Sequence, residues 1–470
     1  MDAFPQISTI IEKQVKIRQI GSTFDDVRGP LRGPSTWEGR PADARVGRRE
    51  AGMHESGAVL RESRWPDDPP LRVCLLIGEP EMGAVDRQLV LLATGLRRRG
   101  VEVTVAVLGG ADAADTGLRA AGVGVIGLGF RPDRPLWSNL AAMGRLARHL
   151  RRTHADVLHA LSFDAHVLGP PLARIAGVPV VVVGRPGVAG DTRHRRWTRF
   201  ALGMADLVIA DARAMADGAG AAGVPADRLA VIYDAVPDSA FADAARTRAA
   251  AECGVVLCVA DFRPGGGHHD LVRAAVLLRE RGRPCLVRLA GDGQERPALE
   301  RLVAELDLGS AQPDLIGTRT QLLGAPDDLL GADPLGAGAD LLGADLLGAG
   351  ADLLSAPPDI DDLLVGADLV VFPSTGDGPG GPVARALAAR RPVVSTDVGA
   401  APELLADGRG ILVPPGDPVR LADAIQAVLN DPAAADRMAR RAQAWTREFL
   451  GTDAMVDQHL DAYTDLLARA

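Results

Sequence analysis

The chain has 470 residues, 47% of them hydrophobic, which suffices for two domains of ordinary size with additional segments. Aromatic residues make up only 3%, which excludes a stacking platform for single-stranded nucleic acid, and the net charge of −9 argues against general polyanion binding. Six of the acidic residues lie in 321–358, a stretch without Lys or Arg, so the remainder carries only about −3. We therefore expect no nucleic-acid partner.

Cysteines and apolar runs bear on the compartment. Cys74, Cys253, Cys258 and Cys285 show no metal-ligand spacing, and three of them lie in or beside apolar runs, which indicates buried thiols in a reducing compartment. The beginning of the chain lacks the apolar core of a signal peptide. No stretch approaches the roughly 20 apolar residues that span a bilayer. We expect a soluble, cytoplasmic protein with no metal.

Residues 1–68 begin with a short amphipathic segment and continue as a Gly-, Pro-, Arg- and Asp-rich run without periodicity. This composition predicts a disordered extension. A helix that docks on a partner is the alternative.

The next 170 or so residues alternate apolar runs with amphipathic ones. Apolar runs typical of buried parallel strands lie at 71–80, 101–110, 123–129, 155–163, 179–186, 205–214 and 229–236. An amphipathic helix is expected at 86–100, ending at Gly100, and a basic helix at 136–153. Strands alternating with helices predict a doubly wound parallel sheet, and we assign it to an N-terminal domain, 69–240.

A second series of the same kind follows the Ala-, Arg- and Asp-rich linker 237–252. Strands are expected at 254–262, 284–293 and 313–318, with helices at 270–281 and 297–306. Further helices are expected at 420–429, 432–445 and 453–469, the last with one apolar face. We assign 250–430 to a C-terminal domain and 431–470 to terminal helices, the last crossing back to the first domain.

The stretch 366–416 organises this second series. It predicts a strand at 369–372, a glycine loop at 376–382, a helix at 383–389 and strands at 392–396 and 410–413. In such units anions bind where the free amides and the dipole of the helix N-terminus converge. The sequence therefore predicts an anion site here.

Residues 321–358 are an acidic, low-complexity insertion. Within it, 328–339 and 340–351 differ only at Pro334 and Leu346, and both resemble the run 362–368. The repeat is too short and too rich in glycine to stack as a solenoid. A mobile acidic loop and a local duplication of a helical edge are both consistent with it.

Several of these stretches, in this order, resemble the family 4 glycosyltransferases. They include LRVCLLIGEPEMGAVDRQLVLLATGLRRRGVEVTVAV (71–107), ADLVIADARAMADGAGAAGVPADRLAVI (205–232) and ARRPVVSTDVGAAPELLADGRGILVPPGDPVRLADAI (389–425). The resemblance implies an α/β protein of GT-B architecture, with two Rossmann-like domains facing a cleft and a nucleoside-diphosphate sugar held mainly by the second. It also implies transfer with retention of configuration, without a metal, through fixed cations and amides that stabilise the departing diphosphate.

Two positions of the family's diphosphate clamp are substituted. Where the family has Arg and Lys after the first strand of the second domain, ADFRPGGGHHDL places Asp261 and Gly266. Arg263 is the cation that we expect to replace them in binding the donor. His268 and His269 are further candidates, and solvated loop residues are the alternative.

The family's E-x7-E pair is also changed around the main glycine loop. The resemblance places Asp377 at the first glutamate, as a catalytic residue, and Arg385 at the second, where the family binds ribose. Arg385 cannot accept a hydrogen bond, so it either reaches a phosphate or pairs on the helix surface. Gly378, Gly380 and Gly381 keep a backbone nest for phosphate.

Other positions follow from the same resemblance. Arg185 stands about where many members have a histidine near the sugar, and Gly83 matches the acceptor-side loop. Glu403 matches a common donor-binding glutamate, although an acid at a helix start is also favourable structurally. For His159 and His166, a role in the core or in helix capping is the preferred interpretation.

The implied function is transfer of a sugar from a nucleotide donor to an unidentified sugar or lipid-linked acceptor, in glycan biosynthesis. The four substituted positions motivate an alternative, a catalytically impaired homologue that binds or assembles within a glycan-synthesis complex. A sugar-nucleotide epimerase of the same architecture fits less well, because the carboxylates and histidines it needs are not visibly placed. Basic residues of 136–153 and 193–196, with Trp137 and Trp197 beside them, suggest peripheral contact with anionic lipid at the inner membrane face, and an ordinary solvated surface is the alternative.

Overall fold

The computed structural model describes most of the chain beyond the first 69 residues. The described stretches are 70–78, 84–110, 115–131, 136–184, 202–241, 254–283, 285–306, 319–323, 360–376 and 380–470. The expected extension 1–68 lies outside them, and so does the acidic repeat apart from its first three residues, which end a strand instead of beginning a loop.

Seven parallel strands form the first sheet, in the order β3-β2-β1-β4-β5-β6-β7. Their bounds are β1 (Arg72–Ile77), β2 (Glu102–Val107), β3 (Gly124–Gly127), β4 (Val157–Ala160), β5 (Val180–Gly184), β6 (Leu207–Ala210) and β7 (Leu229–Val231). At the centre of the sheet, Leu75 pairs with Val105 on one side and with His159 on the other. The strands β4, β5 and β6 are buried along their whole length, as their continuous apolar sequences predict for strands covered on both faces.

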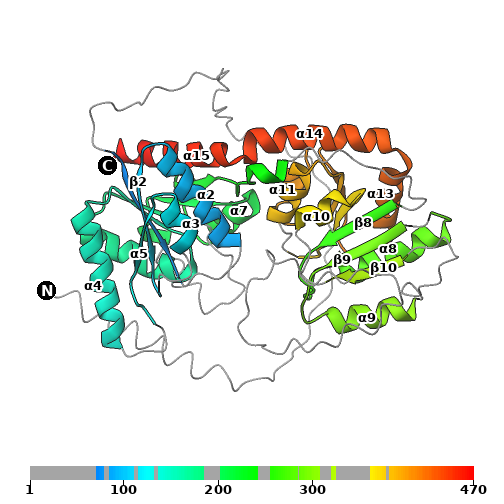
Figure 1. Ribbon diagram of the computed structural model, residues 1–470, viewed down its shortest axis with the longest axis horizontal. Coiled ribbons are helices and arrows are strands. Elements are labelled where there is room, and N and C mark those ends of the chain that lie inside the picture. The colour runs from blue at the N-terminus through cyan, green and yellow to red at the C-terminus, as the bar shows by residue number, and fades with distance from the viewer. Residues whose placement is uncertain are drawn as a thin grey trace.

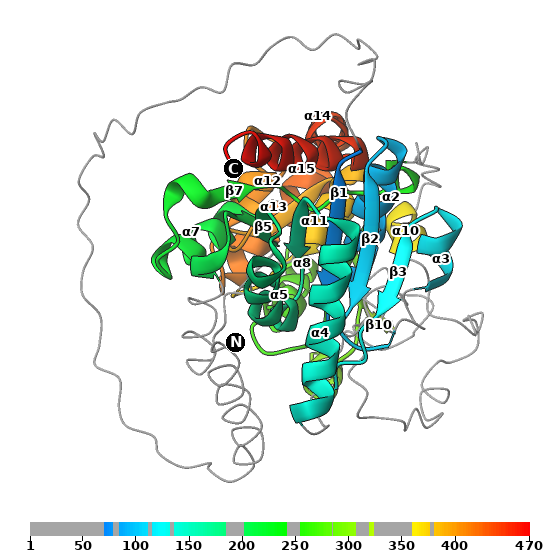
Figure 2. The same ribbon diagram turned by 90° about the vertical axis from the view of Figure 1, so that its left-hand side faces the viewer.

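Helices cover both faces of this sheet. They are α2 (Ala84–Arg98), α3 (Asp115–Ala120), α4 (Leu136–Thr153), α5 (Phe163–Ala176) and α7 (Arg213–Ala221). Side chains of α2 pack on one face together with the C-terminal helix α15 (Thr452–Leu467), whereas α4 and α5 pack on the other. Figure 2 shows α4 and α5 on the near side of the sheet and α15 above it. The helix predicted at 136–153 has the bounds of α4.

Six parallel strands form the second sheet, in the order β10-β9-β8-β11-β12-β13. Their bounds are β8 (Gly254–Val259), β9 (Cys285–Ala290), β10 (Arg319–Leu323), β11 (Leu369–Phe372), β12 (Val393–Thr396) and β13 (Ile411–Val413). The strand expected at 313–318 falls on residues outside the described stretches, and the strand that pairs with β9 is β10, directly after them.

The helices of the second domain pack on both faces of its sheet. They are α8 (His268–Glu280), α9 (Arg296–Glu305), α10 (Ile360–Val365), α11 (Gly380–Ala388), α12 (Ala401–Leu404), α13 (Pro418–Asn430) and α14 (Pro432–Leu450). Helix α14 was expected to end at Trp445 but continues to Leu450, whose side chain is 1% exposed and anchors the last turn in the core.

The chain then returns to the first domain. Figure 1 shows α14 over the second domain and α15 over the first, joined end to end. Close packing of α15 on α2 requires Gly95, because an added Cβ there would lie 2.3 Å from the Val456 Cγ2 atom. The backbone at the crossing is paired as well, since Val236 N donates to Leu450 O at 2.7 Å.

The cysteines agree with the sequence prediction where they are described. Cys74, Cys258 and Cys285 are buried. Burial raises the pKa of the Cys74 and Cys258 thiols to about 12. These thiols are therefore inert core residues.

Candidate functional site

A glycine loop follows β8 at the carboxyl edge of the second sheet. Gly267 has φ +72°, and an added Cβ would lie 1.7 Å from the carbonyl oxygen of Pro373. Thr375 N donates to Gly265 O at 2.7 Å. Because β8 and β11 are neighbours in the sheet, the loops that follow them are pressed together, and only glycine permits this approach.

The ionisable residues of this loop differ in exposure and charge, and therefore in their ability to bind an anion. Arg263 and Asp261 are both exposed. His268 is buried against the Phe262 ring, and burial lowers its pKa to about 4, so it is neutral near pH 7. The Nδ1 atom of His269 lies 3.6 Å from a Glu295 carboxylate oxygen. Within 261–269, Arg263 is therefore the permanent cation offered to solvent.

Helix α11 begins with two glycines beside this loop. An added Cβ on Gly381 would meet nothing within 4 Å, and one on Gly380 would lie 3.2 Å from the Ala400 Cβ. The first turn of α11 thus presents the backbone amides of Gly380 and Gly381 with little side-chain cover, which suits an anion at a helix N-terminus, whereas Pro382 has no N–H to donate.

Arg385, one turn further along α11, forms a two-point ion pair. Its Nε and Nη2 atoms each lie 3.0 Å from a carboxylate oxygen of Asp361 on α10. The Arg385 side chain is 14% exposed and the Asp361 side chain 34%. This contact corresponds to the ion pair that the sequence left open as one of two roles for Arg385.

Glu403, on α12 after β12, meets the first domain. Its Oε1 accepts a hydrogen bond from Arg213 N at 2.8 Å, and its Oε2 accepts one from the Tyr233 hydroxyl at 2.6 Å. Arg213 and Tyr233 both belong to the first domain. The sequence assigned the Glu403 carboxylate to the binding of the nucleotide sugar. In the structure it accepts two hydrogen bonds from the first domain instead.

The carboxyl edge of the first sheet contains buried histidines. The Nδ1 atom of His159 lies 2.7 Å from the Tyr463 hydroxyl of α15, and the Nε2 atom of His166 lies 2.7 Å from Gly184 O. His459, also on α15, contacts Met455 O at 2.8 Å through Nδ1. Burial lowers the pKa of His166 and of His459 to about 4, and lowers that of His159 well below its ordinary value. The preferred core role for His159 and His166 agrees with this burial.

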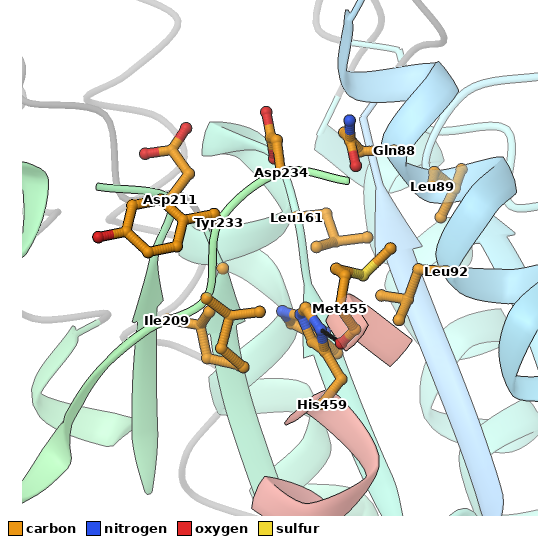
Figure 3. Close-up of a pocket in the computed structure, with 13 residues that line it drawn as sticks. Gln88, Leu89, Leu92, Leu161, Ile209, Asp211, Tyr233, Asp234, Met455 and His459 are labelled. Atoms are coloured by element: carbon orange, nitrogen blue, oxygen red, sulfur yellow. Dashed lines mark hydrogen bonds between the residues drawn. The ribbon is translucent and has the colours of Figure 1, made fainter. Parts of the chain in front are cut away.

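A hollow lies beside these histidines, between α2, the ends of β4 to β7 and α15 (Figure 3). Leu89, Leu92, Ile209 and Met455 form its walls, and Asp211, Asp234 and Gln88 surround the opposite end. It holds about 440 Å³ of empty space, open solvent included. The Nε2 atom of His159 is buried here without a hydrogen-bond partner.

Of the site residues that the resemblance implies, Asp377, Gly378, Arg185 and Gly83 lie outside the described stretches. The basic residues 193–196 and Trp197 of the expected lipid contact lie outside them as well. Of the other site residues, Gly380, Gly381 and Arg263 lie on adjoining segments at one edge of the second sheet. Arg385 and Glu403 follow the same edge, but their side chains are bound to Asp361 and to the first domain.

Sequence reasoning missed the partners of these residues. Asp361, Tyr233 and Tyr463 were not singled out as site residues, because each contacts a residue at least 24 positions away in the chain. His159 and Tyr463, for example, are 304 positions apart. The one apolar face expected for the last helix is the sequence signal that pointed to the burial of Tyr463.

Two family models match the chain. One, described as Glycosyltransferase Family 4, matches residues 85–240, and the other, described as Glycosyl transferases group 1, matches residues 336–431. The two matches fall in the first and second domains respectively.

Curated relatives match over part of their length. An alpha-D-kanosaminyltransferase of Streptomyces kanamyceticus is 27% identical over 213 residues, 45% of this chain and 46% of the relative. A D-inositol 3-phosphate glycosyltransferase of Catenulispora acidiphila is 30% identical over 295 residues, 59% of this chain and 65% of the relative. The chain thus spans between about half and just under two thirds of these relatives.

Solved structures share the fold. HepE of Anabaena, solved in complex with UDP, has 20% identity and a TM-score of 0.64, with 84% of this chain and 100% of HepE covered. A glycosyltransferase of Rickettsia africae has 16% identity and a TM-score of 0.68, with 85% and 100% covered. At these identities the likeness establishes the arrangement of two parallel-sheet domains and nothing finer.

None of the described helices is long and apolar enough to cross a membrane. In the same part of the chain, no group of three or more His, Cys, Asp or Glu side chains is arranged to hold a metal ion.

Proposed function

Because this chain belongs to the family 4 glycosyltransferases and has their GT-B architecture, we propose that it transfers a sugar from a nucleoside-diphosphate sugar to an acceptor hydroxyl. The observation that supports this most directly is the edge of the second sheet. There the glycine loop after β8, with its exposed Arg263, touches the loop after β11 that leads to the bare first turn of α11.

The proposed step breaks the bond between the sugar C1 and the diphosphate oxygen and forms a bond between C1 and the acceptor oxygen. The proton of the acceptor hydroxyl leaves with the diphosphate, and configuration at C1 is retained. Negative charge grows on the leaving diphosphate, so Arg263 and the first amides of α11 would stabilise the transition state more than the bound donor. Neither a metal nor a cofactor is part of the proposal; the family resemblance is the reason. The catalytic role of Asp377 and Arg185, and that of Gly83 on the acceptor side, belong to the same proposal.

Turnover across a panel of UDP-, GDP-, ADP- and dTDP-sugars tests the proposal. Loss of a charge-assisted contact costs about 1.5–3 kcal/mol, so Arg263→Ala should lower kcat/KM by roughly 10- to 100-fold. Arg437→Ala, which removes an exposed arginine on α14, is the matched control and should leave kcat/KM unchanged. Folded protein without hydrolysis or transfer from any donor would refute the proposed activity.

One observation favours a second function, that of a non-catalytic binding or assembly subunit. Arg385 stands where the family accepts hydrogen bonds from ribose, and it is occupied by Asp361. Calorimetric titration with UDP and GDP separates the two functions. Micromolar binding of either nucleotide contradicts a purely structural role, and absence of binding supports it.

We further propose a sugar or lipid-linked acceptor on the side of the first domain, with peripheral contact to an anionic membrane. Arg148 and Arg152 of α4 are exposed. Arg151 donates a hydrogen bond to the carbonyl oxygen of Ile175 on α5, and the side chain of Ile175 is 42% exposed. Such a basic surface with an apolar residue beside it suits anionic lipid. Sedimentation with phosphatidylserine vesicles should show binding that salt reverses; equal recovery with neutral vesicles would sink this part of the proposal.

A further inference from the structure

Glu403 joins the two domains through both of its carboxylate oxygens. One accepts from the backbone N–H of Arg213 at 2.8 Å and the other from the Tyr233 hydroxyl at 2.6 Å. The Glu403 side chain is 14% exposed. A carboxylate that is largely removed from water needs such donors, and here the other domain supplies both of them.

Helix α7 of the first domain lacks a cap of its own. The residue at its N-cap is Ala212, which has extended backbone angles and no side-chain hydrogen bond to offer. The first amides of a helix have no partner within the helix, and a negative charge near them is favourable. Since Arg213 is the first residue of α7, Glu403 supplies the missing cap from across the domain boundary.

Tyr233 is fixed on the same boundary. It lies two residues before Ala235, whose N–H and C=O groups both hydrogen-bond the Gln88 side chain of α2, at 2.9 and 2.8 Å. Burial, and then the bond to Glu403, raise the pKa of Tyr233 to about 12, so its hydroxyl remains a donor. The second contact therefore also ends on a rigid part of the first domain.

The turn that carries Glu403 is held from its own side. Arg409, 6% exposed, donates to the carbonyls of Glu403 and Leu404 at 2.7 and 2.8 Å, and its guanidinium lies 4.1 Å from the centre of the Trp445 ring. Ala212 belongs to the same buried cluster as Ala400 and Leu404. The turn of Glu403 and the start of α7 are thus joined by hydrogen bonds and by apolar packing.

We propose that Glu403 is an interdomain positioning residue, which holds the two domains in the orientation seen here by capping α7 and binding the Tyr233 hydroxyl. The contact of Glu403 would oppose rotation of one domain relative to the other about the crossing at 450–452. Its effect on turnover rests on the proposed function, but the contact itself does not.

The test uses the full chain without substrate. Spin labels at exposed positions of the two domains, Asp227→Cys and Arg273→Cys in a Cys253→Ser background, report the interdomain distance. Hydrogen exchange reports the first amides of α7. Glu403→Ala should lengthen and broaden the distance distribution and speed exchange of those amides roughly fivefold, the usual value of a helix cap.

Two further variants sharpen the result. Tyr233→Phe should give a smaller shift, and the double variant should be no worse than Glu403→Ala, because the two side chains share one contact. Glu448→Ala removes another glutamate of the second domain, exposed on α14, and should match the wild type. If Glu403→Ala leaves both readouts unchanged, the inference is wrong. The same holds if it weakens only UDP binding, since Glu403 would then serve the donor. Because neither the distance measurement nor the exchange measurement contains donor or acceptor, failure of the proposed activity would leave their results intact.

Discussion

The two sheets share one strand order, to which the first sheet adds a seventh strand, but their carboxyl edges differ in chemistry. At the edge of the first sheet, neutral histidines are buried among apolar side chains and covered by α15. At the edge of the second, glycines bring two loops into backbone contact, and Arg263 and Asp261 are exposed. The first edge therefore contributes mainly to packing, whereas the second offers amides and a cation to a charged ligand. A shared fold does not fix where the polar chemistry lies.

The largest expected effect comes from the glycine loop of the second edge. In Gly267→Ala the new Cβ would meet a backbone oxygen at 1.7 Å, at a residue with positive φ, so the loops must separate. We expect a loss of at least about 3 kcal/mol in the free energy of unfolding, measured by urea denaturation. Gly282→Ala is the matched control, with φ +69° and open space around the added atom, and should cost only about 1–2 kcal/mol. Equal losses would show that the close approach is not what requires glycine.

Acid should destabilise the first domain more than the second, because the first domain has more buried histidines. His166 and His459 of the first domain's core have a pKa of about 4, burial lowers the pKa of His159 well below its ordinary value, and in the second domain the pKa of His268 is about 4. In the unfolded chain these groups titrate near 6.5, so below that pH the unfolded state binds protons that the folded state refuses. Stability is complete above about pH 6.5 and falls as the pH drops toward 4, by about 1 kcal/mol per histidine at pH 5.5.

Domain-resolved pulse proteolysis in urea, at pH 7.5 and 5.5, measures this difference. The first domain has three of these buried histidines and the second has one, so the first domain should lose more stability than the second. His459→Gln does not titrate there and should reduce the loss of the first domain by about 1 kcal/mol. Equal losses in the two domains would contradict the assignment of the effect to the buried histidines.

The local elements could be predicted from the sequence, because their signals are local. The strand at 369–372 and the helix at 136–153 have the predicted bounds, since a buried β-branched run and an amphipathic period each depend on neighbouring residues. Helix α14 was predicted too short, because its last turn is held by the burial of Leu450 against the rest of the fold rather than by its own pattern. A sequence pattern does not contain that tertiary contact.

The site was predicted less completely, for a related reason. Family motifs identified Glu403 and Arg385 as residues of the second edge, but a motif does not state what a side chain touches. Glu403 meets residues 170 and 190 positions away, and Arg385 meets a residue on the preceding helix. The identity of these partners depends on how the domains and helices pack, which only the folded structure gives.

The smallest expected effect concerns the ion pair between Arg385 and Asp361. Arg385 stands where the family has a glutamate. Arg385 and Asp361 are joined by two contacts of 3.0 Å and are only partly exposed, so a double-mutant cycle of Arg385→Met and Asp361→Asn should give a coupling of about 1 kcal/mol in unfolding.

Arg385→Glu combined with Asp361→Asn places an acceptor at 385 without a facing carboxylate. If this edge binds ribose as the family resemblance implies, the variant should bind UDP roughly fivefold more tightly than the wild type in calorimetric titration, because a new hydrogen bond contributes about 1 kcal/mol. The single variant Arg385→Glu is the control, since it leaves two carboxylates together and should gain less. An unchanged affinity in both variants would mean that position 385 does not face the nucleotide, and the second edge would then owe its ligand contacts to Arg263 and the backbone of α11 alone.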